Sequence, residues 1–282
     1  MKKVPGILKL LRFELPFSAG VCVVMGQMLA LGDFASVAVT IFGFAAVFLI
    51  SASILVMNDY FDIETDKINA PHRPIPSGLV TPNESLYFSL ILLFTGIFLS
   101  YLINIYVLLI SIVLAVIGFL YNRYFKKSGL SGNLMVCFSV GMTFIYGGVS
   151  VGLPFHKAVL FFGLIAALID LGEEIAADAM DIKGDRLINS NSLAIRYGES
   201  VALKVSSYIF FFVILLSFIP FIINWFSIIY LIPIGIMDAS IAYSTVRLLN
   251  SKNEEGRKFI RWIYLGAILG LIVFIIMRFI GI

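Results

Sequence analysis

The 282-residue chain is 60% hydrophobic and only 13% charged, whereas a soluble domain of this size would be about 25% charged. The apolar residues lie in long uncharged runs and the net charge is only +3, so the composition excludes a soluble protein and predicts a polytopic membrane protein. No polar linker separates the two halves, and residues 1–282 are expected to form one domain. Cys22 and Cys137 lie inside apolar runs, which predicts neither a disulfide nor a zinc site.

Nine membrane-spanning helices are predicted in chain order, each in a run of about 20 residues, long enough to cross a bilayer. The first two cover residues 15–32 and 35–57, and residues 85–122 hold two more that turn near Asn104. The fifth and sixth cover about 132–152 and 157–176. The last three cover about 201–222 and 226–247, on either side of Asn224, and 261–281. The predicted fold class is therefore all-α, a bundle of nine transmembrane helices.

The distribution of positive charge orients this bundle. With the N-terminus in the cytoplasm, all of the 20 lysines and arginines except Lys157 and Arg278 fall on the cytoplasmic side. Cytoplasmic loops of membrane proteins carry an excess of Lys and Arg. We therefore expect a multi-pass protein of the cell membrane whose N-terminus is inside and whose C-terminus is outside.

A run of polar residues follows the second predicted span, Asn58-Asp59-Tyr60-Phe61-Asp62-Ile63-Glu64-Thr65-Asp66. On a helix, Asn58, Asp62 and Asp66 are four residues apart and share one face with Asp59. Stacked like charges destabilise a bare helix, so this face requires a compensating cation. Oxygen ligands without a nearby Cys or His suit a hard ion such as Mg2+ or Ca2+. A solvated acidic loop is the alternative.

The sixth span ends in a second acidic face, where Asp170, Glu174, Asp178, Asp181 and Asp185 recur every three or four residues. The two stretches together hold ten of the 17 acidic residues of the chain. Both would lie at the same depth in the membrane, which predicts a site for more than one Mg2+ ion. Such ions bridge a diphosphate, neutralise it and make it a leaving group.

Basic residues near both stretches are candidates for binding that diphosphate. Arg73 lies in a proline-rich loop, and its planar guanidinium suits phosphate oxygens. Tyr121, Arg123, Lys126 and Lys127 follow the fourth span, where a phenol and an ammonium group can bind the same anion. Tyr and Lys are also common anchors at membrane interfaces, and this simpler interpretation stays open.

Four motifs together resemble the UbiA-type intramembrane prenyltransferases. Asn58-Asp59-x-x-Asp62-x-x-x-Asp66 and Asp178-x-x-Asp181-x-x-x-Asp185 are similar to two signatures of that family, Tyr121-x-x-x-Phe125-Lys126 to a third, and Arg73-Pro-Ile-Pro-Ser-Gly78 to its conserved loop. The resemblance extends over nearly the whole chain. It implies a bundle with a central cavity open to the cytoplasmic side. It also implies Mg2+-dependent transfer of a prenyl group from a prenyl diphosphate, with release of pyrophosphate.

The resemblance also implies roles for the residues that match these motifs. Two Mg2+ ions would be held by Asn58, Asp62 and Asp66 and by Asp178, Asp181 and Asp185. Among these, Asp62, Asp66, Asp181 and Asp185 are the catalytic candidates. The candidates for substrate binding are Arg73, Tyr121 and Lys126, together with Asp59, Lys127 and Arg123.

Within the family, the first stretch and its loop look most like the archaeal lipid branch. This likeness implies transfer of a geranylgeranyl group from geranylgeranyl diphosphate to geranylgeranylglyceryl phosphate in ether-lipid synthesis. Two alternatives stay open: polyprenyl transfer to an aromatic acceptor in quinone synthesis and, in another class, a divalent-cation transporter. The expected partners are a prenyl diphosphate, a lipid-like or aromatic acceptor and membrane lipid, without a nucleic acid or a protein partner.

The chain departs from the family pattern beside the second motif, where Glu173-Glu174-Ile175 replaces the usual Arg-Glu-Ile. An anion thus stands where the family often has a cation near the diphosphate. Asp170 and Glu174 are expected either behind the metal ligands or beside the acceptor. Asp238, deep in the eighth span, either has a function or pairs with a polar group of a neighbouring helix. The sequence does not identify the base that removes the proton of the acceptor.

Overall fold

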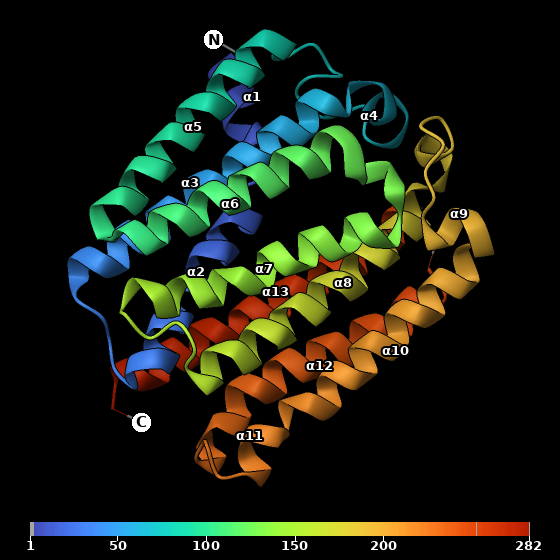
Figure 1. The fold of residues 1–282 in the computed structure, drawn as a ribbon. Coiled ribbons are helices and arrows are strands. Elements are labelled where there is room, and N and C mark those ends of the chain that lie inside the picture. The colour runs from blue at the N-terminus through green and yellow to red at the C-terminus, as the bar shows by residue number, and fades with distance from the viewer. Residues whose placement is uncertain (1–2, 252, 282) are drawn as a thin grey trace.

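The computed structural model describes residues 3–251 and 253–281 as helices joined by turns and short loops. Lys2 and Lys252, two of the cations counted for the predicted orientation, and the C-terminal Ile282 lie outside the described residues. Figure 1 shows the long helices packed side by side, with the short helices at the ends of the bundle.

The long helices are α2 (Glu14–Leu31), α3 (Val37–Phe61), α5 (Pro82–Ile103), α6 (Ile105–Leu120), α7 (Leu130–Ser150), α8 (Lys157–Asp185), α10 (Glu199–Ser217), α12 (Leu231–Leu248) and α13 (Asn253–Phe279). The short elements are α1 (Lys3–Leu10), α4 (Ile63–Asn69), the π-helix η1 (Tyr121–Phe125), α9 (Leu193–Tyr197), α11 (Ile219–Ile222) and the 3-10 turns η2 (Lys126–Ser128) and η3 (Ile228–Tyr230). One end of the bundle carries α1, α4 and α9, and we call it the capped end. The opposite end carries α11 and the C-terminus (Figure 1).

Eight helical segments of the described chain are long and apolar enough to cross a membrane, as judged by length and composition. They match eight of the nine predicted spans. Three of these segments combine consecutive elements: α6 with η1 and η2, α10 with α11, and η3 with α12. The predicted sixth span falls on α8, which is 29 residues long but carries Asp170, Glu173 and Glu174 within its apolar stretch. The chain is therefore an all-helical polytopic membrane protein, as predicted.

Local sequence signals explain where several helices begin and end. Asn104 separates α5 from α6 as predicted, and its side-chain carbonyl accepts a hydrogen bond from the backbone N–H of Val107 at 2.9 Å. Thr81 and Glu84 form a capping box at the start of α5. Asn224, the other predicted turn, lies between α11 and η3 with a left-handed backbone at φ 54°.

The first acidic stretch does not lie on one uninterrupted helix. α3 ends at Phe61 and α4 begins at Ile63, and Asp62 between them has φ −94° and ψ 8°, away from ideal helical geometry. The backbone N–H groups of Asp62 and Asp66 still donate to the carbonyls of Asn58 and Asp62, at 2.9 and 2.8 Å. By contrast, α8 continues without a break to Asp185, so the second acidic face lies on one helix as predicted.

Close contact between α2 and α7 shapes the core of the bundle. A Cβ on Gly26 would lie 2.3 Å from the carbonyl oxygen of Phe144, and a Cβ on Gly147 would lie 2.3 Å from that of Val23. Small residues allow helices in membranes to approach this closely. As a consequence, Phe144 is buried in the largest apolar cluster, which joins α2, α7 and α8 to α10, α12 and α13.

Asp238 pairs with a neighbouring helix. This buried residue of α12 accepts a hydrogen bond at 2.7 Å through its Oδ2 from the hydroxyl of Ser217 on α10. A polar side chain inside a membrane needs such a partner. The contact agrees with the alternative in which Asp238 pairs with a polar group of a neighbouring helix.

Candidate active site

The capped end places the first acidic stretch against arginines. Asp59, only 1% exposed, forms an ion pair with Arg12, and Nη1 of Arg73 lies 3.6 Å from Oδ1 of the same carboxylate. Arg12 reaches Asp59 from the turn between α1 and α2, where its backbone is left-handed with φ 42°. A buried carboxylate is costly unless it is paired. The two arginines therefore allow Asp59 to be buried.

Arg73 also binds Asp66. Its Nη1 donates to both carboxylate oxygens of Asp66, at 2.5 and 2.6 Å. Burial lowers the pKa of Arg73, but the nearby carboxylates, with Asp66 foremost, outweigh burial, and the pKa lies above its ordinary value. For Arg12, burial and the charge of Arg73 lower the pKa more than the neighbouring aspartates raise it. Two guanidinium groups thus share one small acidic region.

The end of α6 brings an amide and an ammonium group to the same place. Nζ of Lys126 forms an ion pair with Oδ2 of Asp62, and Nδ2 of Asn58 donates to Oδ1 of Asn122 at 3.0 Å. Asn122 belongs to the π-helix η1, and Lys126 is the first residue after that helix. π-Helical turns often occur at functional sites. Here η1 adds the Tyr121–Lys126 motif to the first acidic stretch.

The second acidic face lies opposite the first. Arg257 of α13 forms an ion pair with Asp181. Asp62 is close enough to Asp185 to act on it electrostatically, and Tyr121 is likewise a neighbour of Asp178. Residues far apart in the chain therefore meet at the capped end, as the sequence predicts.

Asn69, the last residue of α4, links the two stretches directly. Its Nδ2 donates to the backbone carbonyl of Asp181 at 3.4 Å, and its Oδ1 accepts a hydrogen bond from the backbone N–H of Gly184 at 3.1 Å. A Cβ on Gly184 would lie 2.2 Å from Nδ2 of Asn69. The bare backbone of Gly184 thus gives the Asn69 side chain room to fasten α4 to the end of α8.

Among residues 3–251 and 253–281, no group of three or more His, Cys, Asp or Glu side chains is gathered closely enough to hold a metal ion. Asp66, Asp62 and Asp181 are instead paired with Arg73, Lys126 and Arg257, respectively. The donor chemistry nevertheless fits Mg2+, because the side chains offer carboxylate and amide oxygens and no thiol or imidazole.

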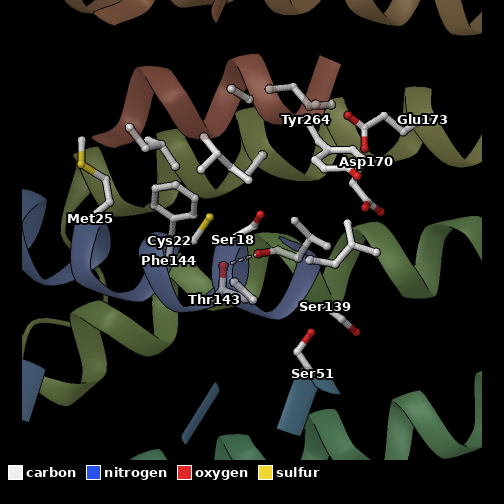
Figure 2. Close-up of a pocket in the computed structure, with 18 of the residues that line it drawn as sticks. Ser18, Cys22, Met25, Ser51, Ser139, Thr143, Phe144, Asp170, Glu173 and Tyr264 are labelled. Carbon is white, nitrogen blue, oxygen red and sulfur yellow. Dashed lines mark hydrogen bonds between the residues drawn. The ribbon is translucent and has the colours of Figure 1, made fainter. Parts of the chain in front are cut away.

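A mainly apolar cavity of about 440 Å³ adjoins the acidic faces. Its walls come from α2, α3, α6, α7, α8, α12 and α13, and along α8 it reaches Ala177, the residue before Asp178. Figure 2 shows Met25 and Phe144 toward one end and Asp170, Glu173 and Tyr264 toward the other. A cavity of this size and lining is typical of a site for an apolar ligand.

Residues 19–277 match the UbiA prenyltransferase family. The chain belongs to this family. The prediction of a prenyltransferase is thereby confirmed, and a family of enzymes replaces the transporter alternative.

Similar proteins of this family share one description. The chain is 34% identical over 255 residues to the digeranylgeranylglyceryl phosphate synthase of Methanocaldococcus jannaschii. This alignment covers 90% of this chain and 89% of that one. It is 35% identical to the protein of the same description from Thermococcus kodakarensis, over 84% of both chains. A solved structure described as digeranylgeranylglyceryl phosphate synthase in membranes is 33% identical, with a TM-score of 0.69 over 97% of this chain and 100% of that chain.

More distant UbiA structures share the fold. A UbiA homologue from Aeropyrum pernix superposes with a TM-score of 0.80 at 19% identity, over 94% of this chain and 99% of that one. A UbiA homologue from Archaeoglobus fulgidus, described as bound to GPP and Mg2+, superposes with a TM-score of 0.72 at 16% identity, over 95% of this chain and 99% of that one.

Two of the residues predicted to bind substrate lie apart from the ion pairs that the aspartates form with Arg73, Lys126 and Arg257. Arg123 is exposed, and its guanidinium lies over the rings of Phe61 and Tyr124, 5.8 and 5.6 Å from their centroids. Lys127 is exposed as well, and its backbone carbonyl accepts a hydrogen bond from the N–H of Asn191 at 2.9 Å. The structure pairs Arg73 and Lys126 with aspartates and places Tyr121 in the π-helix that precedes Lys126.

Sequence reasoning missed five side chains that contact the motif residues: Arg12, Asn69, Asn122, Asn133 and Arg257. Asn133 of α7 donates to Oδ2 of Asp178 at 3.0 Å. Asn122 follows Tyr121 within the third motif, and this adjacency is a signal that could have found it. Asn69 lies three residues after Asp66, next to the first motif, whereas the other three come from segments without a motif.

Proposed function

We propose that this UbiA-family enzyme transfers the geranylgeranyl group of geranylgeranyl diphosphate to geranylgeranylglyceryl phosphate and releases pyrophosphate, in archaeal ether-lipid synthesis. The observation that carries this proposal is the likeness to relatives described by that activity over nearly the whole of both chains. The site supports it, because two acidic faces, cations paired with their aspartates and an apolar cavity are what a diphosphate with a long isoprenoid chain requires.

The cations at the site bind the diphosphate in this proposal. Arg73 and Lys126, now paired with aspartates, exchange a carboxylate oxygen for a phosphate oxygen, and Arg257 does the same beside Asp181. Guanidinium and ammonium groups form strong, charge-assisted hydrogen bonds with phosphate. The phenol of Tyr121 donates to the same anion.

In this proposal the two acidic faces hold Mg2+, and the hydrogen bonds of Asn69 keep α4 against the end of α8. Asn58, Asp62 and Asp66 supply one set of ligands, and Asp178, Asp181 and Asp185 supply a second. Bound Mg2+ neutralises the diphosphate and makes it a leaving group. The cavity takes the isoprenoid chain, and its apolar walls exclude water from the allylic carbon.

The phosphate of the acceptor is held at the rim of the site. Five cations near the acidic stretches are exposed: Arg123, Lys127, Lys183, Arg186 and Arg196. A phosphate monoester carries a charge of about −1.5 to −2 near neutral pH, and such a charge is attracted to a group of cations more strongly than a single carboxylate is. The rim therefore favours a phosphorylated acceptor over a benzoate.

The arrangement in the membrane completes the proposal. Residues 1–282 act as one domain in which α8 is the sixth of nine spans, and the capped end faces the cytoplasm. The charge bias along the sequence supports this orientation, because the cations of the site and its rim lie on the loops of that end.

The proposal is tested with the purified protein in liposomes, geranylgeranyl diphosphate, Mg2+ and three separate acceptors. These are geranylgeranylglyceryl phosphate, its dephosphorylated alcohol and 4-hydroxybenzoate, with products identified by mass spectrometry. We expect the phosphate to be prenylated and the alcohol to be a much poorer acceptor. Prenylation of 4-hydroxybenzoate, with none of the glyceryl phosphate, would place the activity in the aromatic branch.

A further inference from the structure

Two carboxylates that face the cavity form no ion pair within the described part of the chain, in contrast to Asp62, Asp66 and Asp181. Asp170 and Glu173 lie three residues apart on α8 and both line the cavity (Figure 2). One oxygen of each, Oδ2 of Asp170 and Oε1 of Glu173, is buried and accepts no hydrogen bond from the described part of the chain. Ionisable groups in such surroundings are costly, which marks them as functional candidates.

Several hydroxyl groups of the cavity are already engaged. Ser18, Ser139 and Thr143 each donate to a backbone carbonyl of their own helix, at 2.6, 2.9 and 2.7 Å. The phenol of Tyr264 donates to Oε2 of Glu14 at 2.9 Å. Hydroxyl groups are also weak bases near neutral pH. The carboxylates of α8 are therefore the groups of this wall that are suited to accept a proton.

The position of Glu173 along α8 distinguishes it from its two neighbours. Glu174 also lines the cavity, but among the carboxylates of this wall in the described chain only Asp170 and Glu173 have a buried oxygen without a hydrogen-bond partner. Glu173 precedes Asp178 by five residues, which is about 7.5 Å along a helix. Asp170 lies about one turn deeper. Glu173 is thus the cavity carboxylate placed just inside the diphosphate, where the allylic carbon meets the acceptor.

We propose that Glu173 is the general base that takes the proton of the acceptor hydroxyl, an inference that rests on the proposed function. The glyceryl oxygen bonds to the allylic carbon of the donor, and its proton passes to the Glu173 carboxylate. The bond between that carbon and the diphosphate oxygen breaks, and its electron pair leaves with pyrophosphate. One C–O bond forms and one breaks, and no oxidant or reductant is required. Asp170, one turn away, is a positioning residue that keeps this side of α8 polar.

The test compares Glu173→Gln with Asp238→Asn in the liposome assay. Asp238 is a second carboxylate inside the bundle, but it binds Ser217 and does not line the cavity. Loss of a general base lowers the rate about 100-fold or more. We expect that loss in kcat for Glu173→Gln, with the KM for geranylgeranyl diphosphate changed less than about threefold. Asp238→Asn should keep the wild-type kcat.

A second readout separates the loss of a base from a damaged fold. In Glu173→Gln the diphosphate still leaves, so more geranylgeraniol should form per pyrophosphate released, because water captures the donor that the acceptor does not. Glu173→Asp keeps a carboxylate one methylene further back and should recover part of the lost kcat. It also carries the test if the Gln variant does not fold.

The outcomes distinguish this inference from the proposed function. If the wild-type protein does not prenylate geranylgeranylglyceryl phosphate, the proposed function fails. If the wild-type protein does so and Glu173→Gln retains full kcat, or Glu173→Asp folds but recovers no activity, the assignment of Glu173 as the base is overturned.

Discussion

Lys126 forms an ion pair with Asp62 at the point where the chain passes from α3 to α4. The two residues are 64 positions apart in the sequence. Asp62 interrupts the helix of the first acidic stretch, and Lys126 follows the π-helical turn that ends α6. The pair therefore joins two motifs in one site and places an ammonium group beside the carboxylates that would bind a metal.

Replacing Lys126 with Met should lower kcat/KM for geranylgeranyl diphosphate about 10- to 100-fold, since a hydrogen bond to a charged group contributes about 1.5–3 kcal/mol. Lys204→Met is the control, because Lys204 is an exposed lysine of α10 to which the proposal gives no role. The control should differ from the wild type by less than about twofold. Initial rates of pyrophosphate release measure both variants, and equal losses would contradict a specific role for Lys126.

Removal of the metal or of one of its ligands should abolish prenyl transfer. EDTA should stop the reaction and added Mg2+ should restore it. Asp62→Asn and Asp181→Asn should each lower kcat by about 100-fold or more, because each replaces a charged oxygen ligand with a neutral amide. Asp33→Asn, an exposed position in the turn after α2, serves as the control. Full activity in EDTA would exclude the proposed metal chemistry.

The residues that could be predicted from the sequence are those whose spacing is local. The two acidic stretches repeat every three or four residues, and Arg73 and Lys126 stand within motifs of their own. Arg12 and Arg257 carry no such signal, because they are 47 and 76 positions away from Asp59 and Asp181. Tertiary packing alone brings these two arginines to the site.

The course of the helices could be predicted only in part, because the spacing of residues does not show where a helix bends. A four-residue period is the same for a straight helix and for one that bends at Asp62, so the sequence did not reveal the break. The contact of Asn69 with the backbone of α8 holds α4 in its bent position. The predicted sixth span stopped at residue 176 because residues 177–199 were assigned to a polar loop. In the structure α8 extends to Asp185, since its acidic face packs against partners from α7 and α13.

The predicted orientation can be tested with single cysteines at the two ends of the bundle. Lys127 is exposed near the capped end, and Phe155 is 84% exposed in the turn between α7 and α8. Cys22 and Cys137 are buried, so they can be replaced by Ala to give a background without thiols. In sealed cells, a membrane-impermeant reagent should label Phe155→Cys and should label Lys127→Cys only after the membrane is opened. The same sidedness at both positions would contradict the predicted topology.

The contact between α2 and α7 should be sensitive to a single methyl group. Gly26→Ala should lower the free energy of unfolding by about 1–3 kcal/mol, because its Cβ cannot fit against the carbonyl oxygen of Phe144 without a backbone shift. Gly235→Ala on α12 is the matched control: nothing lies within 4 Å of the added Cβ, and Ala favours a helix over Gly by about 1 kcal/mol. Its thermal midpoint should therefore be unchanged or higher.

Gly26→Ala should affect the cavity more strongly than the metal site. Met25 and Phe144 flank this contact and line the cavity, whereas the aspartates lie at the capped end. Gly26→Ala should consequently raise the KM for geranylgeranyl diphosphate more than it lowers kcat, while the Mg2+ dependence stays that of the wild type. Thermal unfolding in detergent and steady-state kinetics measure the two effects. A midpoint at or above that of Gly235→Ala would show that α2 and α7 do not need this close approach.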